Sequence, residues 1–402
     1  MVKSGRSGAY ASVGGARAAC IVGVGETEYR RWGGFTDRSE LSLACEAVLN
    51  ALADAGLSAG DVDGLTSYGG DANEPSRLQD ALGLTEVRFA SMVWGGGGTG
   101  SCGGLMQAAI AVESGAADVV VVLRALCQGQ SRRYGQFNPA RPGNNFLAPF
   151  GMLSPPSMIA PLVQRYMHLH GVTPEQMAHV ALSARMNAHR NPNAVMRGRP
   201  LDMDSYLAAR MIADPLRLFD CCQENDGACA VIVTSLDRAR DLPHKAVRVL
   251  SSGQGSNPGW GTGALGGHNM PDDEYARGNA SRLARELYSA AGIVARNVDV
   301  AQIYDHFSGL VLMSLENFGF CDRGGGGDFV AAGNIYRDGG SLPINTSGGH
   351  LSEAYIHGMN LIAEGVRQMR GQSMAQVADA RICLVTGGLA GPPATAVIVG
   401  AD

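Results

Sequence analysis

The chain repeats part of itself at a constant spacing, and this feature constrains its fold more than any other. One copy reads "DAGLSAGDVDGLTSYGG" from Asp54, and the other reads "AAGIVARNVDVAQIYDHFS" from Ala290. An offset of 236 positions aligns Ala55-Gly56-Leu57 with Ala291-Gly292-Ile293, Asp61-Val62-Asp63 with Asn297-Val298-Asp299, and Tyr68 with Tyr304. In each copy an alanine-rich stretch ends in glycine and leads into an apolar segment, as a helix followed by a strand does. Chance similarity of two ordinary helix-to-strand connections is the alternative, but the constant offset over fourteen positions favours duplication.

A second pair of similar segments supports the duplication. The segment "GGLMQAAIAVESGAADVVVVL" starts at Gly103, and "HGMNLIAEGVRQMRG" starts at His357 and is followed by "DARICLVTGG". Both read as a glycine-led helix followed by a strand. The strands, with "ACAVIVTS" and "ATAVIVGA", are nearly continuous apolar runs, which is typical of sheets covered on both faces. With 402 residues and 45% apolar composition, the chain is long enough for a large α/β core.

The region between the two halves has a different character. It contains "YGQFNPARPGNNFLAPFGMLSPP" and then a strong helix start, with Thr173 as the N-cap, Pro174 at the first helical position and Gln176 at the third. Insertions that carry their own helices commonly line a site. We expect a flexible leader at 1–18, an N-terminal half at 19–126 that continues at 219–240, an inserted loop domain at 127–218, and a C-terminal half at 241–402.

Charge and cysteine content exclude several classes of protein. The net charge is −5 and the pI is near 6, so nucleic acid and anionic membranes are not expected partners. The nine cysteines are scattered, no CxxC occurs, and the opening residues lack the apolar core of a secretory signal. The apolar runs are too short to span a bilayer. We therefore expect a cytoplasmic protein with reduced thiols, no metal site and no bound cofactor.

Several longer motifs resemble those of a known superfamily. They are "GVTPEQMAHVALSARMNAHRNPNA", "ARMIADPLRLFDCCQENDGACAVIV" and the closing "GGLAGPPATAVIV". Together with the duplicated core and the insertion, they resemble thiolases, and most of all the group that includes the sterol carrier protein thiolases. The resemblance covers the chain from about Ala18 to the end. It implies a duplicated thiolase fold of five αβαβα layers, with an insertion that covers an acyl-CoA pocket, in a homodimer.

Four sequence blocks carry the chemistry of thiolases, and this chain departs from all four. Where the nucleophilic cysteine stands in the family, the chain has Gly97, in the run "GGTGS". In the block that reads N-E-A-F or H-D-C-F in thiolases, the chain has "YDHF", with Tyr304 at its first position. In the G-H-P-x-G block, "AYIHG" places Tyr355 at the position of the histidine. The final C-x-G loop has become "VTGG" and contains no cysteine. Thiolysis needs an S-acyl intermediate, which glycine cannot form.

The two tyrosines suit a reaction without a covalent intermediate. Retro-aldol cleavage of a β-hydroxyacyl-CoA needs a base for the hydroxyl proton, donors for the developing enolate and an acid for the α-carbon. A phenol both donates and accepts, but its usual pKa near 10 requires neighbours that lower it, and His306, His350 and His357 are the candidates. Backbone N–H groups at Gly97 and Gly388 are the candidate oxyanion hole, because the family's donors at these positions belong to the main chain.

The same substitutions occur in the thiolase-fold aldolases of steroid side-chain degradation. The resemblance to this branch implies cleavage of a 17-hydroxy steroid side-chain CoA thioester to a 17-ketosteroid and propionyl-CoA. It also implies a partner with a DUF35 segment, a zinc-ribbon and OB-fold module. We expect Tyr304 and Tyr355 to divide the base and acid roles, with Tyr304 as the base, and His306 and His357 to assist. The CoA thioester enters as substrate.

Three interpretations compete with this one. The chain could be a thiolase or acyltransferase that uses a different cysteine, or a non-catalytic acyl-CoA-binding scaffold subunit. The tyrosines could be buried aromatics that only fill space. For Cys102, a packed residue in the first turn of a helix is favoured over a displaced nucleophile, because five residues along a helix is roughly 7 Å. The stretch "GSNPGWGTGALGG" at 255–267 is either part of the pantetheine channel or a surface loop.

Overall fold

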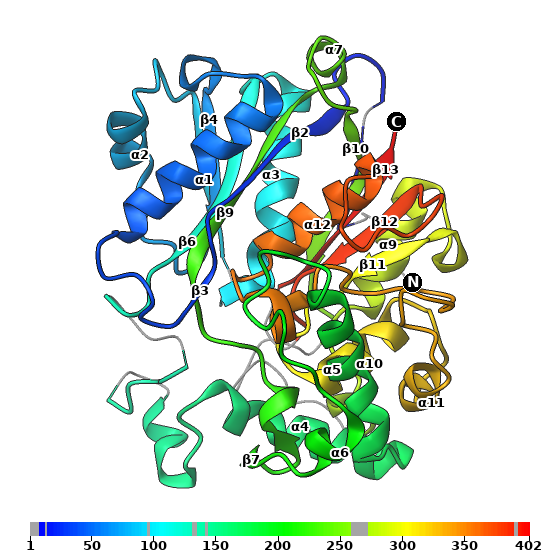
Figure 1. Ribbon diagram of the computed structural model, residues 1–402. Helices are drawn as coiled ribbons and strands as arrows, with labels where there is room; N and C mark the ends of the chain where they lie inside the picture. The colour runs from blue at the N-terminus through cyan, green and yellow to red at the C-terminus, as the bar shows by residue number, and fades with distance from the viewer. Residues whose placement is uncertain are drawn as a thin grey trace.

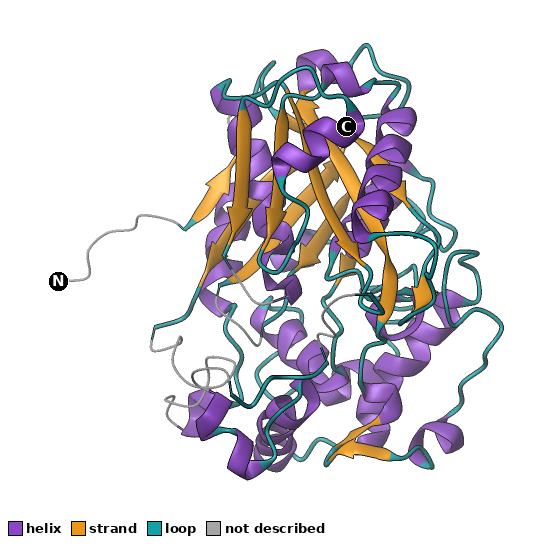
Figure 2. Ribbon diagram, turned by 90° about the vertical axis from the view of Figure 1, so that its left-hand side faces the viewer, coloured by secondary structure: helices purple, strands orange, loops and turns teal. Residues whose placement is uncertain are grey.

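The computed structural model describes residues 8–12, 14–94, 97–130, 135–140, 144–258, 272–389 and 393–402. A large mixed sheet runs through the molecule with helices on both faces, and a group of helices packs beyond one end of it (Figures 1 and 2). The strand order of this sheet is β11-β12-β13-β10-β2-β9-β6-β4-β5, with the short β1 and β3 attached at its sides.

The two halves of the sheet have the same topology, so the predicted duplication is confirmed. The N-terminal half contains β2 (Ala19–Glu26), β4 (Gly64–Tyr68), β5 (Phe89–Val93), β6 (Val119–Leu126) and β9 (Asn225–Ser235). The C-terminal half contains β10 (Val247–Gly255), β11 (Val300–Gln302), β12 (Ile382–Thr386) and β13 (Ala394–Ala401). In both halves a parallel pair is followed by two antiparallel pairs, as β4-β6-β9-β2 and as β11-β12-β13-β10.

The helices repeat as well, and their glycine caps explain the sequence offset. α1 (Glu40–Ala55) ends at Gly56 and α9 (Ser281–Ala291) ends at Gly292, each glycine in the left-handed region that an L side chain avoids. The short helices η1 (Ala59–Asp61) and η7 (Ala295–Asn297) follow at the same spacing. α3 (Ser101–Ser114) and α12 (Met359–Arg370) form the second matched pair.

The buried apolar clusters define five layers. α1 packs on one face of the N-terminal strands, and α9 packs against the strands of the C-terminal half. α3 and α12 lie between, because each contacts strands from both halves in one shared apolar core. This αβαβα arrangement is the duplicated thiolase fold that the resemblance implied.

The inserted region contributes helices beyond the end of the sheet. It contains α4 (Pro155–His170), α5 (Pro174–Ala188), α6 (Met203–Leu207), the pair β7 (Met211–Ala213) and β8 (Leu216–Arg217), and the short helices η3 (Asn144–Phe146), η4 (Ala148–Phe150) and η5 (Leu218–Asp220). Thr173 caps α5 by accepting from the Gln176 N–H, as its sequence predicted.

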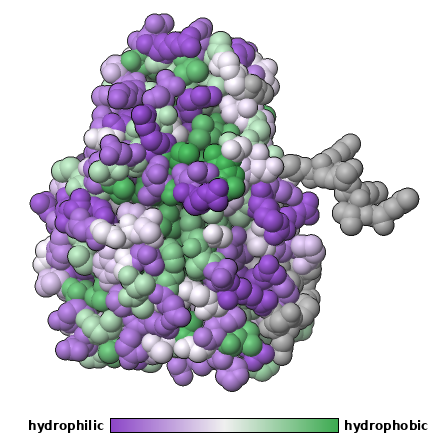
Figure 3. Space-filling view, turned by 90° about the vertical axis from the view of Figure 1, so that its right-hand side faces the viewer, coloured by the Kyte–Doolittle hydropathy of each residue, from purple (hydrophilic) through white to green (hydrophobic). Residues whose placement is uncertain are grey.

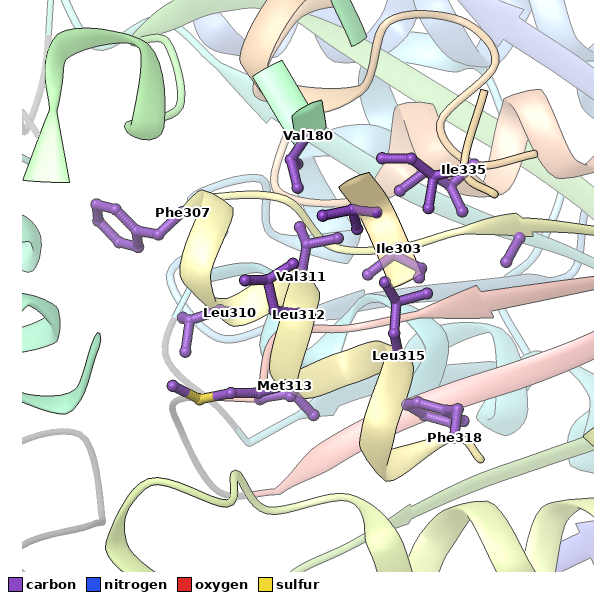
Figure 4. Close-up of a cluster of buried hydrophobic side chains, with 14 of the residues drawn as sticks. Val180, Ile303, Phe307, Leu310, Val311, Leu312, Met313, Leu315, Phe318 and Ile335 are labelled. Atoms are coloured by element: carbon purple, nitrogen blue, oxygen red, sulfur yellow. The ribbon is translucent and has the colours of Figure 1, made fainter. Parts of the chain in front are cut away.

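α5 packs against α10 (Ser308–Asn317) and α11 (Gly326–Ala331) of the C-terminal half. Figure 4 shows the result, a cluster in which Val180 of α5 lies near side chains of α10 and its flanks. The remaining short elements are β3 (Arg30–Arg31), α2 (Pro75–Leu82), α7 (Leu236–Ala239), α8 (Asp272–Tyr275), η2 (Gly97–Gly100) and the single π-turn η8 (Gly349–Glu353).

Part of the segment expected as a leader forms a strand. β1 (Ala9–Ala11) pairs antiparallel with β10, and Ser12 Oγ donates to Glu113 Oε1 at 2.7 Å. These contacts order the segment, because backbone hydrogen bonds of an edge strand replace those with water.

All nine cysteines are free thiols. No helix in the described ranges is long and apolar enough to cross a membrane. On the face seen in Figure 3, apolar residues gather near the middle among hydrophilic ones.

Candidate functional site

Two tyrosine hydroxyls meet at the centre of the site. Tyr304 follows β11 and Tyr355 follows η8, and their hydroxyl oxygens are 2.8 Å apart in a hydrogen bond that either can donate. Fifty-one positions separate them in the chain. The fold therefore brings together the two tyrosines that the sequence placed in different blocks.

Tyr304 and its chain neighbours are buried in two different apolar clusters at the end of β11. Its chain neighbours Ile303 and Phe307 are buried in the cluster around α10, whereas Tyr304 itself, 3% exposed, packs into the central core with α3 and α12. Its N–H donates to Thr386 Oγ1 at 3.0 Å. Opposing anchors on neighbouring residues fix the direction in which the ring points.

Three glycines from three separate loops leave the space that the Tyr304 ring fills. A Cβ on Gly98 would lie 2.0 Å from the Tyr304 hydroxyl, and one on Gly358 would lie 3.1 Å from its ring. On Gly388 a Cβ would come within 3.3 Å of the ring. The tyrosine and the glycine at 98 are therefore mutually dependent, because no other side chain fits beside this hydroxyl.

Tyr355 is half-buried and lies beside two histidines. Its N–H donates to Asn225 Oδ1 at 2.8 Å, which fixes its backbone to the start of β9. Its ring centroid is 4.9 Å from that of His350 and 4.8 Å from that of His357, both edge-on. Tyr355 is therefore the more accessible of the two phenols.

Gly97 faces the reactive groups with its Cα. It begins η2 with a φ of 53°, in the left-handed region. A Cβ at this position would lie 3.9 Å from both Tyr355 Oη and His357 Nε2. The position that carries the nucleophile in thiolases thus points at a phenol and an imidazole, with no thiol.

The histidines surround the tyrosines and are neutral. The ring of His306 lies 4.8 Å from that of Tyr304, and burial lowers the pKa of His306 to about 4. His350 is fully buried 4.5 Å from the Tyr304 ring, and burial holds its pKa well below the usual value. Its Nδ1 is 3.2 Å from Asp305 Oδ1, and burial raises the pKa of Asp305 to about 7.

The expectation that neighbours lower the pKa of the tyrosines is wrong for this arrangement. Burial raises the pKa of Tyr304 and of Tyr355, and the adjacent phenol adds to the rise for Tyr304. The neutral histidines supply no positive charge, and the Arg124 charge, which opposes the rise at Tyr355, does not cancel the effect of burial. A free tyrosinate is therefore costly to form at either position.

Cys102 has the structural role that the sequence favoured. Its side chain is fully buried in the first turn of α3 with Sγ 3.5 Å from Val385 O. Burial raises the pKa of its thiol to about 12, so no thiolate forms near neutral pH. Of the stretch at 255–267, residues from 259 onward lie outside the described ranges.

The structure brings together all six predicted site residues: Tyr304, Tyr355, His306, His357, Gly97 and Gly388. Sequence reasoning missed Gly98, Asn225 and also Arg124, whose Nη2 lies 2.7 Å from His357 Nδ1. The last had a visible signal, because it is the single charge within the apolar strand "VVVVLRAL". Gly98 and Asn225 had none, since their partners are distant in the chain.

Comparisons with known proteins show what the whole chain is similar to. Residues 268–400 match the family described as "Thiolase C-terminal domain-like". The chain is 43% identical to a 17-hydroxy-3-oxo-4-pregnene-20-carboxyl-CoA lyase of Mycobacterium tuberculosis, over 95% of this chain and 99% of that protein. It is 42% identical to a steroid side-chain-cleaving aldolase of Thermomonospora curvata, over 96% and 98%. A solved structure described as "Ltp2-ChsH2(DUF35) aldolase" superposes with a TM-score of 0.88 at 41% identity, covering 96% of this chain and 98% of its own.

Proposed function

Because the chain belongs to the thiolase superfamily, among the thiolase-fold aldolases that cleave steroid side chains, we propose that it splits a 17-hydroxy steroid side-chain CoA thioester into a 17-ketosteroid and propionyl-CoA. It is a carbon–carbon lyase acting on an acyl-CoA, not a classical thiolase. The observation that carries the proposed mechanism is the hydrogen bond between Tyr304 and Tyr355 beside Gly97.

The proton balance of a retro-aldol reaction fits a pair of neutral phenols. The hydroxyl loses its proton as the bond between the carbinol carbon and the α-carbon breaks, and in the same step the departing α-carbon takes one proton. No proton is gained or lost overall. One tyrosine accepts the hydroxyl proton while it passes its own to the other, which protonates the α-carbon. Such a relay needs no free tyrosinate, which accords with the raised pKa of both phenols.

The surroundings favour one direction for this relay. Burial raises the pKa of Tyr355, and the Arg124 charge opposes this rise in part. For Tyr304 the neighbouring phenol adds to the rise caused by burial. We therefore propose Tyr355 as the group that accepts the hydroxyl proton and Tyr304 as the group that serves the α-carbon, the reverse of the assignment made from sequence.

The thioester oxygen is proposed to bind the backbone N–H groups of Gly97 and Gly388. Gly97 begins the turn that leads into α3, where the positive end of the helix dipole favours a developing negative charge. Gly388 lies against the Tyr304 ring at the end of the loop after β12. The reaction as proposed consumes no cofactor, because the CoA moiety arrives with the substrate.

We further propose a DUF35 partner and a homodimer. The partner rests on the solved complex described as an aldolase with a DUF35 chain, at 41% identity.

Support for the dimer is the sheet edge at β5, where Trp94 is 91% exposed and Met92 is 51% exposed. An apolar strand edge of this kind favours pairing with another chain.

The decisive experiment incubates the protein, with its DUF35 partner, with a β-hydroxyacyl-CoA that carries a tertiary alcohol and a methyl group on the α-carbon. We expect ketone and propionyl-CoA in equal amounts, with Cys102→Ala as active as the unmodified chain and Tyr304→Phe at least about 100-fold slower. Loss of activity in Cys102→Ala would refute the proposal in favour of a cysteine-dependent enzyme. Acyl-CoA binding without cleavage would indicate the scaffold role instead.

A further inference from the structure

Arg124 is a fully buried charge that points toward the site from the middle of the sheet. It lies on β6 at 0% exposure, and its Nη1 donates to Tyr68 O at 3.0 Å. The guanidinium stacks over the Tyr68 ring at 5.0 Å and lies 3.8 Å from the buried Asp71 carboxylate. A charge in this position is costly to bury unless it is well paired, so its role needs explaining.

The other end of the guanidinium holds a histidine. Arg124 Nη2 lies 2.7 Å from His357 Nδ1. A guanidinium only donates hydrogen bonds, so Nδ1 must accept and the ring proton must reside on Nε2. Burial lowers the pKa of His357, and the Arg124 charge and His350 lower it further. The ring of Tyr355 also faces His357. His357 is thereby kept neutral in a single tautomer.

The orientation of the imidazole is fixed as well. His357 has a φ of 47°, and its carbonyl oxygen accepts from Tyr68 Oη at 2.9 Å. Its Nε2 points toward Gly97, 3.9 Å from where a Cβ would lie, and Tyr355 Oη lies at the same distance from that point. An N–H donor and a phenol therefore border the same point, where a side chain at position 97 would begin.

We infer that Arg124 is a positioning residue, which sets His357 as a permanently neutral Nε2–H donor to the thioester oxygen beside Gly97. This inference rests on the proposed retro-aldol function. It excludes His357 as the base, because its only free lone pair is occupied by the guanidinium. His357 and the backbone N–H groups then together stabilise the negative charge on the thioester oxygen, while the two phenols transfer the proton.

A glutamine at 357 separates this role from acid–base catalysis. The amide oxygen of Gln accepts from Arg124, and its NH2 group donates toward the thioester oxygen, but it cannot take a proton. We expect kcat to fall about 100-fold in His357→Ala, the range for loss of one preorganised donor, and to recover to within about tenfold of the unmodified chain in His357→Gln. Equal activities in the Gln and Ala variants would overturn the inference.

The role of Arg124 is tested by the shape of the pH profile. In Arg124→Met the pKa of His357 rises but stays below the usual value of imidazole, because burial, the larger cause of its depression, remains; we expect a new limb at the acidic end of the pH profile of kcat. The limb should be absent in the double variant Arg124→Met/His357→Gln and in the surface control Arg88→Met, whose side chain is 42% exposed. A general loss of activity without the limb would show that Arg124 is only structural.

An activity-independent measurement keeps the inference separate from the proposed function. The ring nitrogens of His357, labelled with 15N and assigned with His357→Gln, should show the Nε2–H tautomer from pH 5 to 8. This signature should be lost in Arg124→Met, and its persistence there would refute the inference. If the signature is present but the chain cleaves no hydroxyacyl-CoA, the arginine–histidine pair stands and the retro-aldol proposal fails.

Discussion

Replacing Gly98 with alanine should disable the site through a single methyl group. The added Cβ would lie 2.0 Å from the Tyr304 hydroxyl and 2.2 Å from the nearest ring carbon. Gly98 does not have a positive φ, so alanine causes no backbone strain and the effect is purely steric. To reach ordinary contact at 3.4 Å, the hydroxyl and the methyl must separate by about 1.4 Å.

The ring cannot make this movement without losing its partner. Gly358 and Gly388 lie against other parts of it, and the hydroxyl is 2.8 Å from Tyr355. A displacement of about 1 Å in a reacting group costs about 100-fold in rate, and overpacking costs about 1–3 kcal/mol of stability. We expect both effects in Gly98→Ala.

The assay combines initial rates of 17-ketosteroid formation with thermal unfolding. The control is Gly60→Ala, where the new Cβ meets its neighbours at 3.6 and 3.7 Å and should change neither quantity. In a Tyr304→Ala background the clash disappears, so adding Gly98→Ala should then cost less than about 0.5 kcal/mol. A Gly98→Ala variant with the unmodified kcat, or an equal loss of stability in both backgrounds, would refute the reasoning.

The remaining predictions concern protons. In D2O, exchange of the α-protons of propionyl-CoA should be lost in Tyr304→Phe and partly retained in Tyr355→Phe, followed by NMR or mass; the opposite result would restore Tyr304 as the base. Burial raises the pKa of Asp305 to about 7. The protonated carboxyl group therefore stabilises the folded chain. This stabilisation is fully present below about pH 4, and it is lost as the pH rises through 7. Asp305→Asn should therefore be less stable than the unmodified chain at pH 5, with a deficit in Tm that shrinks by pH 8. A deficit that does not change with pH would show that Asp305 is ionised throughout.

The local features of the chain were encoded in its sequence. Glycine at the end of each matched helix, the capping residues of α5 and the apolar strands follow from contacts between residues a few positions apart, so patterns reveal them. The loss of the cysteine at position 97 and the two new tyrosines were equally visible, because family motifs are local. These features predicted the duplicated fold, and they predicted a lyase in place of a thiolase.

The relations among the site residues were decided only by the tertiary structure. Arg124 and His357 are 233 positions apart, and Gly98 meets Tyr304 across more than half the chain. Whether a tyrosine is a base depends on its burial and on neighbouring charges, which no motif records, and here burial raised the pKa that the sequence required to be low. The sequence by itself determined which groups are present. The packing of the two halves determined which of them touch, which are charged and where their protons lie.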